Sequence, residues 1–418
     1  MMPIFKQIFI TAAVLCLAGC RSGDTSVATP PMGWNSWISY GTSVTEDEVR
    51  DVADYMSDNL LEYGWQYVVV DAGWYAPGMV TLEQYEGSHP YQLVDKWGRL
   101  IVDPQKFPSA EGGTGFRALS DYVHSKGLKL GLHIMRGVPI QAYEQDCPIK
   151  GTPYTIRDIA DTVNVCDWYF GFYGIDMSKP GAREYYKSLF DLYEQWGIDY
   201  VKADDLLSPS YAESDIEAIS QAAYHRRHPI MLSLSPGPAP LSKAGHLRKV
   251  CALWRISEDF WDNWESLKKQ FPLCASWQDS TGNGHWADAD MLPIGLMALR
   301  AMRGEPRQSG FTQSEQRVMM TLWAFFRSPL MLGCSLSQID PFTYSLITDR
   351  KLIEINQKST GNRQLSREGD IVVWYASLEN EDCYAVFNLG EETAEYDLDG
   401  IDRVAVGPHD VELVFRRK

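Results

Sequence analysis

The feature that most constrains the fold is a regular alternation of short apolar runs with amphipathic segments. The apolar runs predict buried strands at residues 66–71, 128–134, 200–205, 230–235 and 253–257. Between them stand helical patterns such as residues 183–196, which stop at Gly197. Strands that alternate with helices form parallel βα units. Because the pattern continues to about residue 333, we predict an α/β protein with a (β/α)8 TIM barrel.

Polar residues stand at or just after the carboxyl ends of these predicted strands. They are Asp71, His133, Asp204, Ser235 and residues 255–259. In a (β/α)8 barrel the carboxyl ends of all strands share one rim, and active sites are built there. A glycine-rich phosphate-binding fingerprint is absent from the sequence, which counts against an open dinucleotide-binding sheet.

The pattern changes beyond about residue 337. Short β runs with polar turns between them follow at residues 370–375, 382–388 and 410–415. They predict a C-terminal antiparallel β-sandwich domain at residues 337–418, after a barrel domain at residues 29–336. A chain of 418 residues is long enough for a large barrel and a modest second domain.

The N-terminus has the pattern of an export signal. Lys6 precedes an apolar run at residues 8–17, which is too short to span a bilayer of about 30 Å as a helix. The run ends in Leu17-Ala18-Gly19-Cys20, which resembles a bacterial lipobox. A plain secretory signal with a coincidental cysteine is the alternative. We predict a lipoprotein signal peptide at residues 1–19, a tether at residues 20–28, and a membrane anchor through lipid on Cys20, with the side of the membrane left open.

Charge and cysteine spacing exclude some classes of partner. With 38 basic and 55 acidic side chains the net charge is −17, and such a field repels a nucleic-acid backbone. No CxxC, HxH or HExxH spacing indicates a metal site, so we expect neither a metal ion nor another cofactor. Export would place the cysteines in an oxidising compartment. A Cys147–Cys166 or Cys251–Cys274 disulfide and buried free thiols are equal alternatives.

Several motifs follow one another along the chain in the order found in a known enzyme family. They are residues 30–37 (PPMGWNSW), 70–74 (VDAGW), 127–131 (GLKLG), 202–204 (KAD), Trp254-Arg255 with Asp259, 286–292 (WADADML) and 328–331 (SPLM). Together they resemble glycoside hydrolase family 27, the α-galactosidase and α-N-acetylgalactosaminidase family. The resemblance implies a retaining exo-acting α-glycosidase that hydrolyses terminal α-linked galactose-type residues of oligo- or polysaccharides. A carbohydrate is therefore the expected substrate.

Acetal hydrolysis needs one carboxylate to trap the oxocarbenium-like centre and one carboxylic acid to protonate the leaving oxygen. Asp204 is the predicted nucleophile, because it ends a buried strand with Lys202 two residues back on the same face. A nearby ammonium favours the ionised carboxylate. The resemblance implies the same role, since the family nucleophile is the aspartate of a Lys-x-Asp strand end. The adjacent Asp205 is predicted instead to cap the next helix.

Asp259 is the predicted acid/base. It matches an aspartate that in the family stands four residues after an arginine, here Arg255. Glu258 and Asp262 compete with it as loop carboxylates. A retaining mechanism would place the carboxyl groups of Asp204 and Asp259 roughly 5–5.5 Å apart. A different class of protein, a non-catalytic carbohydrate-binding lipoprotein, would not need both aspartates.

The resemblance also implies a set of sugar-binding residues. Trp34 would form a stacking wall, Asp71 and Lys202 would bind ring hydroxyls, and Arg255 would lie near the 2-substituent. Burial of Trp34 in the barrel core is an alternative, as is an ion pair between Arg255 and Glu258.

Three further residues are predicted near the rim by their position after a strand or by a motif match. His133 and Arg136 depart from the usual family residues, so their roles stay open, although His133 is counted among the substrate-binding residues. Asp290 matches a motif and is expected to support the site rather than touch sugar.

Three departures from the family pattern concern the sugar. Ala72 stands where α-galactosidases usually carry a second aspartate, so one carboxylate that would hold the far hydroxyls is missing. Ser235 replaces a glutamate that reads the 2-hydroxyl, which resembles the N-acetylgalactosaminidase pattern. Gly73 replaces a cysteine of a family disulfide. The resemblance therefore also admits α-N-acetylgalactosaminidase, β-L-arabinopyranosidase and isomaltodextran-cleaving activities.

Overall fold

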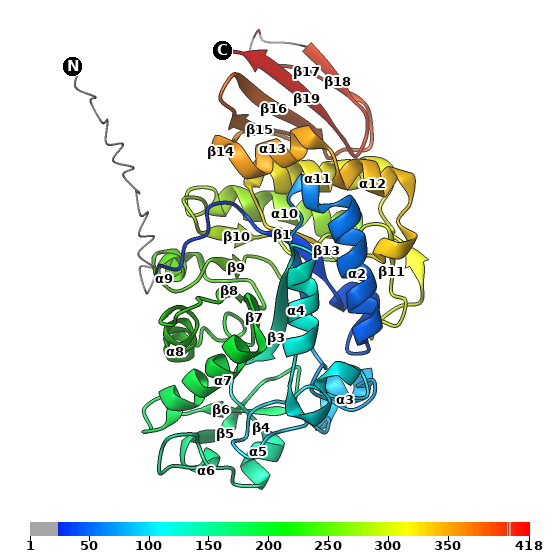
Figure 1. The fold of residues 1–418 in the computed structure, drawn as a ribbon. Helices are drawn as coiled ribbons and strands as arrows, with labels where there is room; N and C mark the ends of the chain where they lie inside the picture. The colour runs from blue at the N-terminus through cyan, green and yellow to red at the C-terminus, as the bar shows by residue number, and fades with distance from the viewer. Residues whose placement is uncertain (1–23, 399, 401–402) are drawn as a thin grey trace, which may run out of the picture.

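Eight parallel strands form the centre of the computed structural model, which describes residues 24–398, 400 and 403–418 (Figure 1). Their order is β10-β9-β8-β7-β3-β2-β1-β13. In chain order they are β1 Met32–Asn35, β2 Tyr67–Val70, β3 Lys129–Met135, β7 Tyr200–Asp204, β8 Met231–Leu234, β9 Leu253–Arg255, β10 Trp286–Asp288 and β13 Leu330–Leu332. Just after β10, Leu292 forms a parallel bridge with Leu332 and its N–H donates to the carbonyl of Met331. The sheet therefore curls round so that its two edge strands, β10 and β13, meet, and the predicted (β/α)8 barrel is confirmed.

Helices follow the strands and cover the barrel. They are α1 Trp37–Tyr40, α2 Glu46–Asn59, α3 Leu82–Gly87, α4 Arg117–Ser125, α7 Ala182–Trp196, α8 Glu213–Tyr224, α9 Ala244–Val250, α10 Trp264–Trp277 and α11 Gln313–Phe326. Helix α7 ends where the sequence predicts, because Gly197 adopts a φ of 77° and its N–H donates to the carbonyls of Tyr193 and Glu194. Such a left-handed residue is the common way to terminate a helix, and it favours glycine. No helix among the described residues combines the length and the apolar character needed to cross a bilayer.

An inserted segment between β3 and β7 forms a small antiparallel sheet of its own. Its strands, in the order β4-β6-β5, are β4 Val138–Pro139, β5 Ala160–Val165 and β6 Phe172–Ile175, with helices α5 Ile140–Glu144 and α6 Ile156–Ile159. In Figure 1 this sheet lies at the lower end of the molecule. No local pattern in the sequence predicted this sheet, because β4 has two residues and the β5–β6 pairing contains an irregularity, so none of the three strands shows a long alternating pattern.

The C-terminal unit pairs four strands into one antiparallel sheet and two into a hairpin. The sheet has the order β14-β15-β16-β19, and its strands are β14 Thr360–Glu368, β15 Ile371–Ser377, β16 Glu381–Asn388 and β19 Asp410–Arg417. The hairpin consists of β17 Ala394–Asp397 and β18 Arg403–Val406. Helices α12 Pro341–Ile347 and α13 Arg350–Lys358 stand between the barrel and the first strand. The predicted sandwich is confirmed as an architecture, while the domain boundary near residue 337 stays a prediction.

Successive side chains of these strands point to opposite faces of the four-stranded sheet, and both faces bury apolar residues. On one face Val373, Val386 and Val414 pack against the hairpin residue Val406. On the other face the rings of Phe387 and Trp374 meet those of Phe271 in α10 and Phe326 in α11, at centroid distances of 5.0 and 6.2 Å. The C-terminal sheet thus shares its core with the barrel helices.

The six cysteines in the described residues are all buried and free, so neither predicted disulfide alternative forms.

Replacing Phe387 tests how much this shared core contributes to stability. Phe387 is fully buried, so Phe387→Ala leaves a cavity and is expected to lower the free energy of unfolding by about 3–5 kcal/mol. Phe415 is 42% exposed on the neighbouring strand β19, so the matched change Phe415→Ala is expected to cost less than about 1 kcal/mol. Urea unfolding followed by tryptophan fluorescence measures both. Equal losses in the two variants would contradict the packing described here.

Candidate active site

A cavity of about 440 Å³ opens at the carboxyl ends of the barrel strands. It brings together six of the residues singled out in the sequence. These are Asp71, Lys202, Asp204, Arg255, Asp259 and Asp290. They come from β7, β9 and the segments after β2, β9 and β10, which are far apart in the chain. Strand ends and family motifs had singled them out in the sequence, and the structure places all six in one cavity.

Asp204 is held in a fixed orientation at the end of β7. One carboxylate oxygen, Oδ2, accepts a hydrogen bond from Nε2 of His133 at 2.8 Å. The other, Oδ1, accepts from the hydroxyl of Ser235 at the end of the neighbouring strand β8. The residue is only 7% exposed, although it lines the cavity. Both oxygens are therefore oriented by neighbouring strands while the carboxylate still faces a substrate.

Lys202 controls the charge of this carboxylate. Its ammonium lies 3.0 Å from Oδ2 of Asp71, to which it donates, and 3.9 Å from Oδ2 of Asp204. Burial alone would raise the pKa of Asp204, but the Lys202 ammonium and His133 outweigh burial and hold this pKa below its ordinary value. At Asp71, too, burial raises the pKa, but Lys202 and His133 outweigh burial and lower it. Hydrogen bonds donated by Ala72 and Asn35 lower this pKa further. Burial opposes the charge on Lys202, yet the two carboxylates raise its pKa above the ordinary value.

Asp259 has a very different environment. It lies in the loop after β9, its side chain is 64% exposed, and it pairs with Nη2 of Arg255 at 3.1 Å. Arg255 itself is buried and binds Oδ1 of Asp290 through Nη1 at 2.7 Å. The guanidinium also donates to the carbonyl of Ser257. Arg255 is thus a buried ion-pair partner of Asp290 and Asp259 rather than of Glu258, the alternative named from the sequence.

The different environments of Asp204 and Asp259 suit acid–base chemistry on a bound acetal. Asp204 is buried and fixed, whereas Asp259 is open to the cavity and to solvent. Glu258 also lines the cavity, but Asp262 forms an ion pair with Arg307 and is not among the lining residues. The separation of 5–5.5 Å between the carboxyl groups of Asp204 and Asp259 stays a prediction.

Three of the predicted substrate-binding residues do not line this cavity. Trp34 is fully buried, and its indole N–H donates to the carbonyl of Cys334 at 2.8 Å. This is the core position named above as its alternative. His133 and Ser235 lie behind Asp204 and are 0% and 1% exposed. Ser235 lines a separate void of about 20 Å³ inside the barrel. Both residues contact the nucleophile candidate rather than the open cavity.

Asp205 and Arg136 form a buried ion pair beside the site. Their side chains meet at 2.8 Å, and the Arg136 Nε–H also donates to the carbonyl of Asp205. The prediction that Asp205 caps the next helix is wrong. Helix α8 begins only at Glu213, and the side chain of Asp205 is committed to Arg136.

Part of the cavity wall is aromatic, and these residues were not predicted from the sequence. Trp37, Tyr85, Trp168 and Trp261 line it. Tyr85 is in α3, Trp168 is in the loop between β5 and β6, and Trp261 follows β9. None stands at a predicted strand end, so the rule that found the charged residues could not find them.

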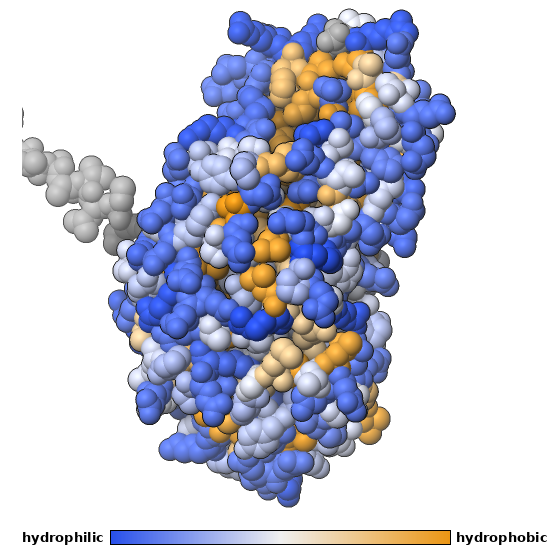
Figure 2. Space-filling view, turned by 90° about the vertical axis from the view of Figure 1, so that its right-hand side faces the viewer, coloured by the Kyte–Doolittle hydropathy of each residue, from blue (hydrophilic) through white to orange (hydrophobic). Residues whose placement is uncertain are grey.

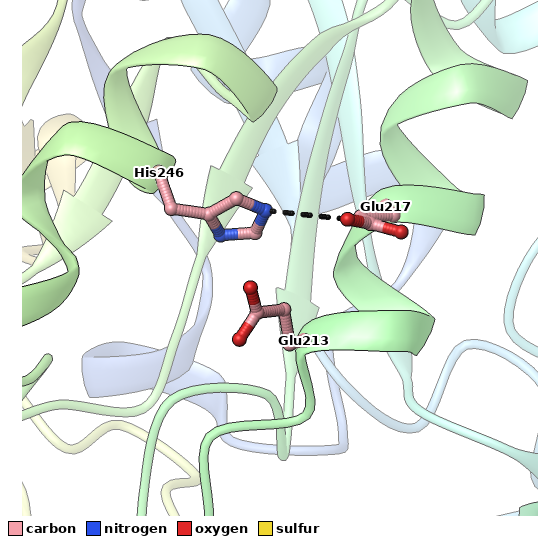
Figure 3. Close-up of side chains that lie close together, drawn as sticks. All are labelled: Glu213, Glu217 and His246. Carbon is pink, nitrogen blue, oxygen red and sulfur yellow. Dashed lines mark ion pairs between the residues drawn. The ribbon is translucent and has the colours of Figure 1, made fainter.

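A second cluster of charged side chains lies away from the cavity. Glu213 and Glu217 of α8 face His246 of α9, and their possible ligand atoms lie within 4.8 Å of one another (Figure 3). Glu213 is 2.5 Å from the ammonium of Lys243, and His246 is 3.9 Å from Glu217 and hydrogen-bonded to Tyr211. The charges of this cluster already have protein partners.

Comparison with known proteins identifies the family. The model of the alpha galactosidase A family matches residues 29–168 and 150–358. The chain belongs to glycoside hydrolase family 27. The fold is similar to that of the family 27 β-L-arabinopyranosidase from Geobacillus stearothermophilus, with 43% identity, a TM-score of 0.90, and coverage of 93% of this chain and 97% of the other.

Two further relatives show the range of the resemblance. The structure of a putative α-N-acetylgalactosaminidase from Bacillus halodurans has 40% identity, a TM-score of 0.83, and coverage of 94% of this chain and 99% of the other. Alpha-galactosidase A of Cellvibrio japonicus is 28% identical over 406 residues, which are 91% of this chain and 81% of that protein. The protein described here is therefore a glycoside hydrolase of family 27.

The pH profile of this family 27 enzyme should report the role of Lys202. A nucleophilic Asp204 must be ionised, so activity falls as pH drops through its pKa, which Lys202 holds below the ordinary value of about 3.9. In Lys202→Met the ammonium is gone, that pKa rises, and the acid limb of kcat/KM is expected to move up by at least about one pH unit. Lys202→Arg keeps the charge and should keep the limb in place. An unmoved limb in Lys202→Met would exclude this electrostatic role.

Proposed function

We propose that this enzyme is a retaining exo-acting glycosidase that removes one terminal pyranose of galacto configuration, with Asp204 as nucleophile and Asp259 as acid/base. One observation carries the proposal. A single cavity holds a buried aspartate, oriented by His133 and Ser235 and adjacent to Lys202, together with an exposed aspartate. A double-displacement mechanism needs these two carboxyl environments.

The reaction follows from these environments in two steps. In the first, Asp259 protonates the glycosidic oxygen while the Asp204 carboxylate attacks the anomeric carbon, and the leaving alcohol departs from a covalent glycosyl-enzyme. In the second, ionised Asp259 takes a proton from water, the water attacks the anomeric carbon from the opposite side to Asp204, and the ester bond to Asp204 breaks. The sugar leaves with its original anomeric configuration. Asp71, Lys202 and Arg255 supply charged groups that can bind the ring hydroxyls.

A β-L-arabinopyranosyl residue is the preferred sugar in this proposal, with α-D-galactosyl as the second candidate. The two sugars share the configuration of the ring hydroxyls and the anomeric bond, but arabinopyranose lacks the hydroxymethyl group on C5. Ala72 supports the smaller sugar, because it is buried and offers no side-chain hydrogen bond where α-galactosidases carry a second aspartate. The likeness to the Geobacillus β-L-arabinopyranosidase supports the same sugar.

The acetamido sugar has less support from the site. The sequence supported this sugar through the small side chain of Ser235, which leaves room that a glutamate would fill. However, the Ser235 hydroxyl is hydrogen-bonded to Asp204, and the residue is not among those that line the open cavity. The room around Ser235 therefore does not extend the space available to the substrate.

A panel of p-nitrophenyl glycosides tests the proposed function. We expect kcat/KM for the β-L-arabinopyranoside to exceed that for the α-D-galactopyranoside by about 10- to 100-fold, since a site without a partner for one hydroxyl discriminates only modestly. The α-N-acetylgalactosaminide should be the slowest of the three. Highest activity on the acetamido sugar, or turnover of none, would refute the proposal.

Two variants attribute the activity to this site. Asp204→Asn should keep the fold and lose activity by at least about 10³-fold, because the amide cannot act as the nucleophile. Asp262→Asn is the matched control, since Asp262 pairs with Arg307 outside the cavity and its change should leave the activity in place. Circular dichroism verifies that both variants are folded.

We also propose that the protein is exported and anchored to a membrane by lipid on Cys20, which lies outside the described residues. The sequence Leu17-Ala18-Gly19-Cys20 after a short apolar run supports this proposal. An anchored exo-glycosidase would act on sugars outside the cytoplasm.

Fractionation of bacterial cells expressing the full chain tests the anchor. Wild-type protein should sediment with membranes and incorporate a labelled fatty acid, whereas Cys20→Ser should do neither. Cys16→Ser, in the apolar run of the same signal, should behave as wild type. Labelling of the Cys20→Ser protein would contradict the proposal, because the lipid would then be attached to another residue.

A further inference from the structure

The cavity has two chemically different parts. Its inner part is charged, with Asp71, Lys202, Asp204 and Arg255 all largely buried. Its other part is aromatic: the Trp37 and Tyr85 rings lie 5.6 Å apart and the Tyr85 and Trp168 rings 5.8 Å apart, centroid to centroid. Burial and the nearby carboxylate of Asp204 raise the pKa of the Tyr85 hydroxyl, so this ring adjoins the charged part. We call these three residues the aromatic row. The proposed cleavage chemistry uses only the charged part, so the row needs a separate explanation.

Three separate segments build the aromatic row. Trp37 comes from α1, Tyr85 from α3, and Trp168 from the β5–β6 loop of the inserted sheet. Tyr85 also packs on the buried Tyr169, at 4.6 Å between ring centroids, and Tyr169 packs on Phe172 at 5.7 Å. The back of the row is thus fixed to the core of the inserted sheet. All three rings remain partly exposed and line the cavity.

The surface around α3 is unusually apolar. Of the seven large hydrophobic residues that are well exposed in the described part of the chain, three fall within residues 79–91, namely Met79, Leu82 and Tyr91. Leu82 also lines the cavity. Figure 2 shows the side of the molecule that carries α3 and β11 (Leu296–Met297), where apolar side chains gather within a mostly hydrophilic surface. The cavity therefore continues outward over an apolar rim.

An ion pair joins two sides of this rim. Glu86 of α3 pairs with Arg303, which lies in the segment after β11, and both residues line the cavity. The pair joins α3, which carries Tyr85, to the segment that follows β11. The aromatic row therefore has contacts both in the core and at the rim.

We propose that the aromatic row is a binding site for the leaving group, and that its ligand is a pyranose ring on the reducing side of the scissile bond, stacked on Trp168. This inference rests on the proposed function, which places the terminal sugar on the charged inner part. The row starts beside the charged part at Tyr85 and reaches Trp168 in the β5–β6 loop, so the remainder of the substrate can extend along it. The C–H faces of a pyranose are apolar and pack well on an aromatic ring, whereas its hydroxyl edge can reach Glu86 and Arg303.

A comparison of two substrates that carry the same terminal sugar tests this site. A disaccharide glycoside can occupy the row, and the corresponding methyl glycoside cannot. In the wild-type enzyme we expect kcat/KM to be at least about 10-fold higher for the disaccharide, because binding energy from a remote group is used in the transition state. This arm needs no variant, so its outcome does not depend on the folding of a mutant.

Substitution of Trp168 gives the second arm. In Trp168→Ala the ratio of kcat/KM between disaccharide and methyl glycoside should fall by about 10-fold, and Trp168→Phe should recover most of it because a ring is restored. The matched control is Trp97→Ala, which removes a partly buried tryptophan outside the cavity and should keep the wild-type ratio. If Trp168 had a purely structural role, Trp168→Ala would lower kcat/KM equally for both substrates and leave the ratio unchanged.

The outcomes separate this inference from the proposed function. If the wild-type enzyme hydrolyses both substrates and the ratio is near one, or does not change in Trp168→Ala, the row is not a leaving-group site and the proposed function stands. If the wild-type enzyme hydrolyses neither substrate, the proposed function fails and the inference fails with it. A ratio that falls in Trp168→Ala and recovers in Trp168→Phe supports the inference.

Discussion

The position of one ammonium between two buried carboxylates is the constraint on which the catalytic cavity depends. Lys202 lies 3.0 Å from Asp71 and 3.9 Å from Asp204, and all three side chains are shielded from water. Unpaired, each charge would be costly to bury. Together they keep both aspartates ionised, and so a carboxylate is available for attack at the bottom of a cavity where a lone carboxyl group would tend to be protonated.

The barrel supplies the geometry that this charge arrangement needs. Lys202 and Asp204 lie two residues apart on β7 and therefore face the same side, while His133 on β3 and Ser235 after β8 reach Asp204 from the two neighbouring strands. Each strand carries one part of the arrangement. The acid/base candidate Asp259 instead lies in a loop, where solvent can exchange its proton.

Strand geometry accounts for part of the predicted site, family motifs supplied Asp259 and Asp290 in the segments after β9 and β10, and the aromatic residues of the cavity were missed. Asp71, Lys202 and Asp204 were found because a buried strand and its carboxyl end can be recognised from an apolar run. Trp34 was predicted at the sugar but lies in the core, where its N–H binds Cys334, and Trp37 lines the cavity instead. Tyr85 and Trp168 belong to segments without periodicity, and their approach depends on tertiary packing that no local pattern encodes.

The inserted sheet between β3 and β7 has a consequence for how such an enzyme could diversify. It contributes Trp168 to the cavity wall, yet its own strands are not hydrogen-bonded to those of the barrel. Natural or engineered replacement of this module could exchange the surface that meets the departing group while the strands that hold Asp204 keep their register. Selectivity for what is released and competence to release it would then be separable traits, encoded by different stretches of one chain.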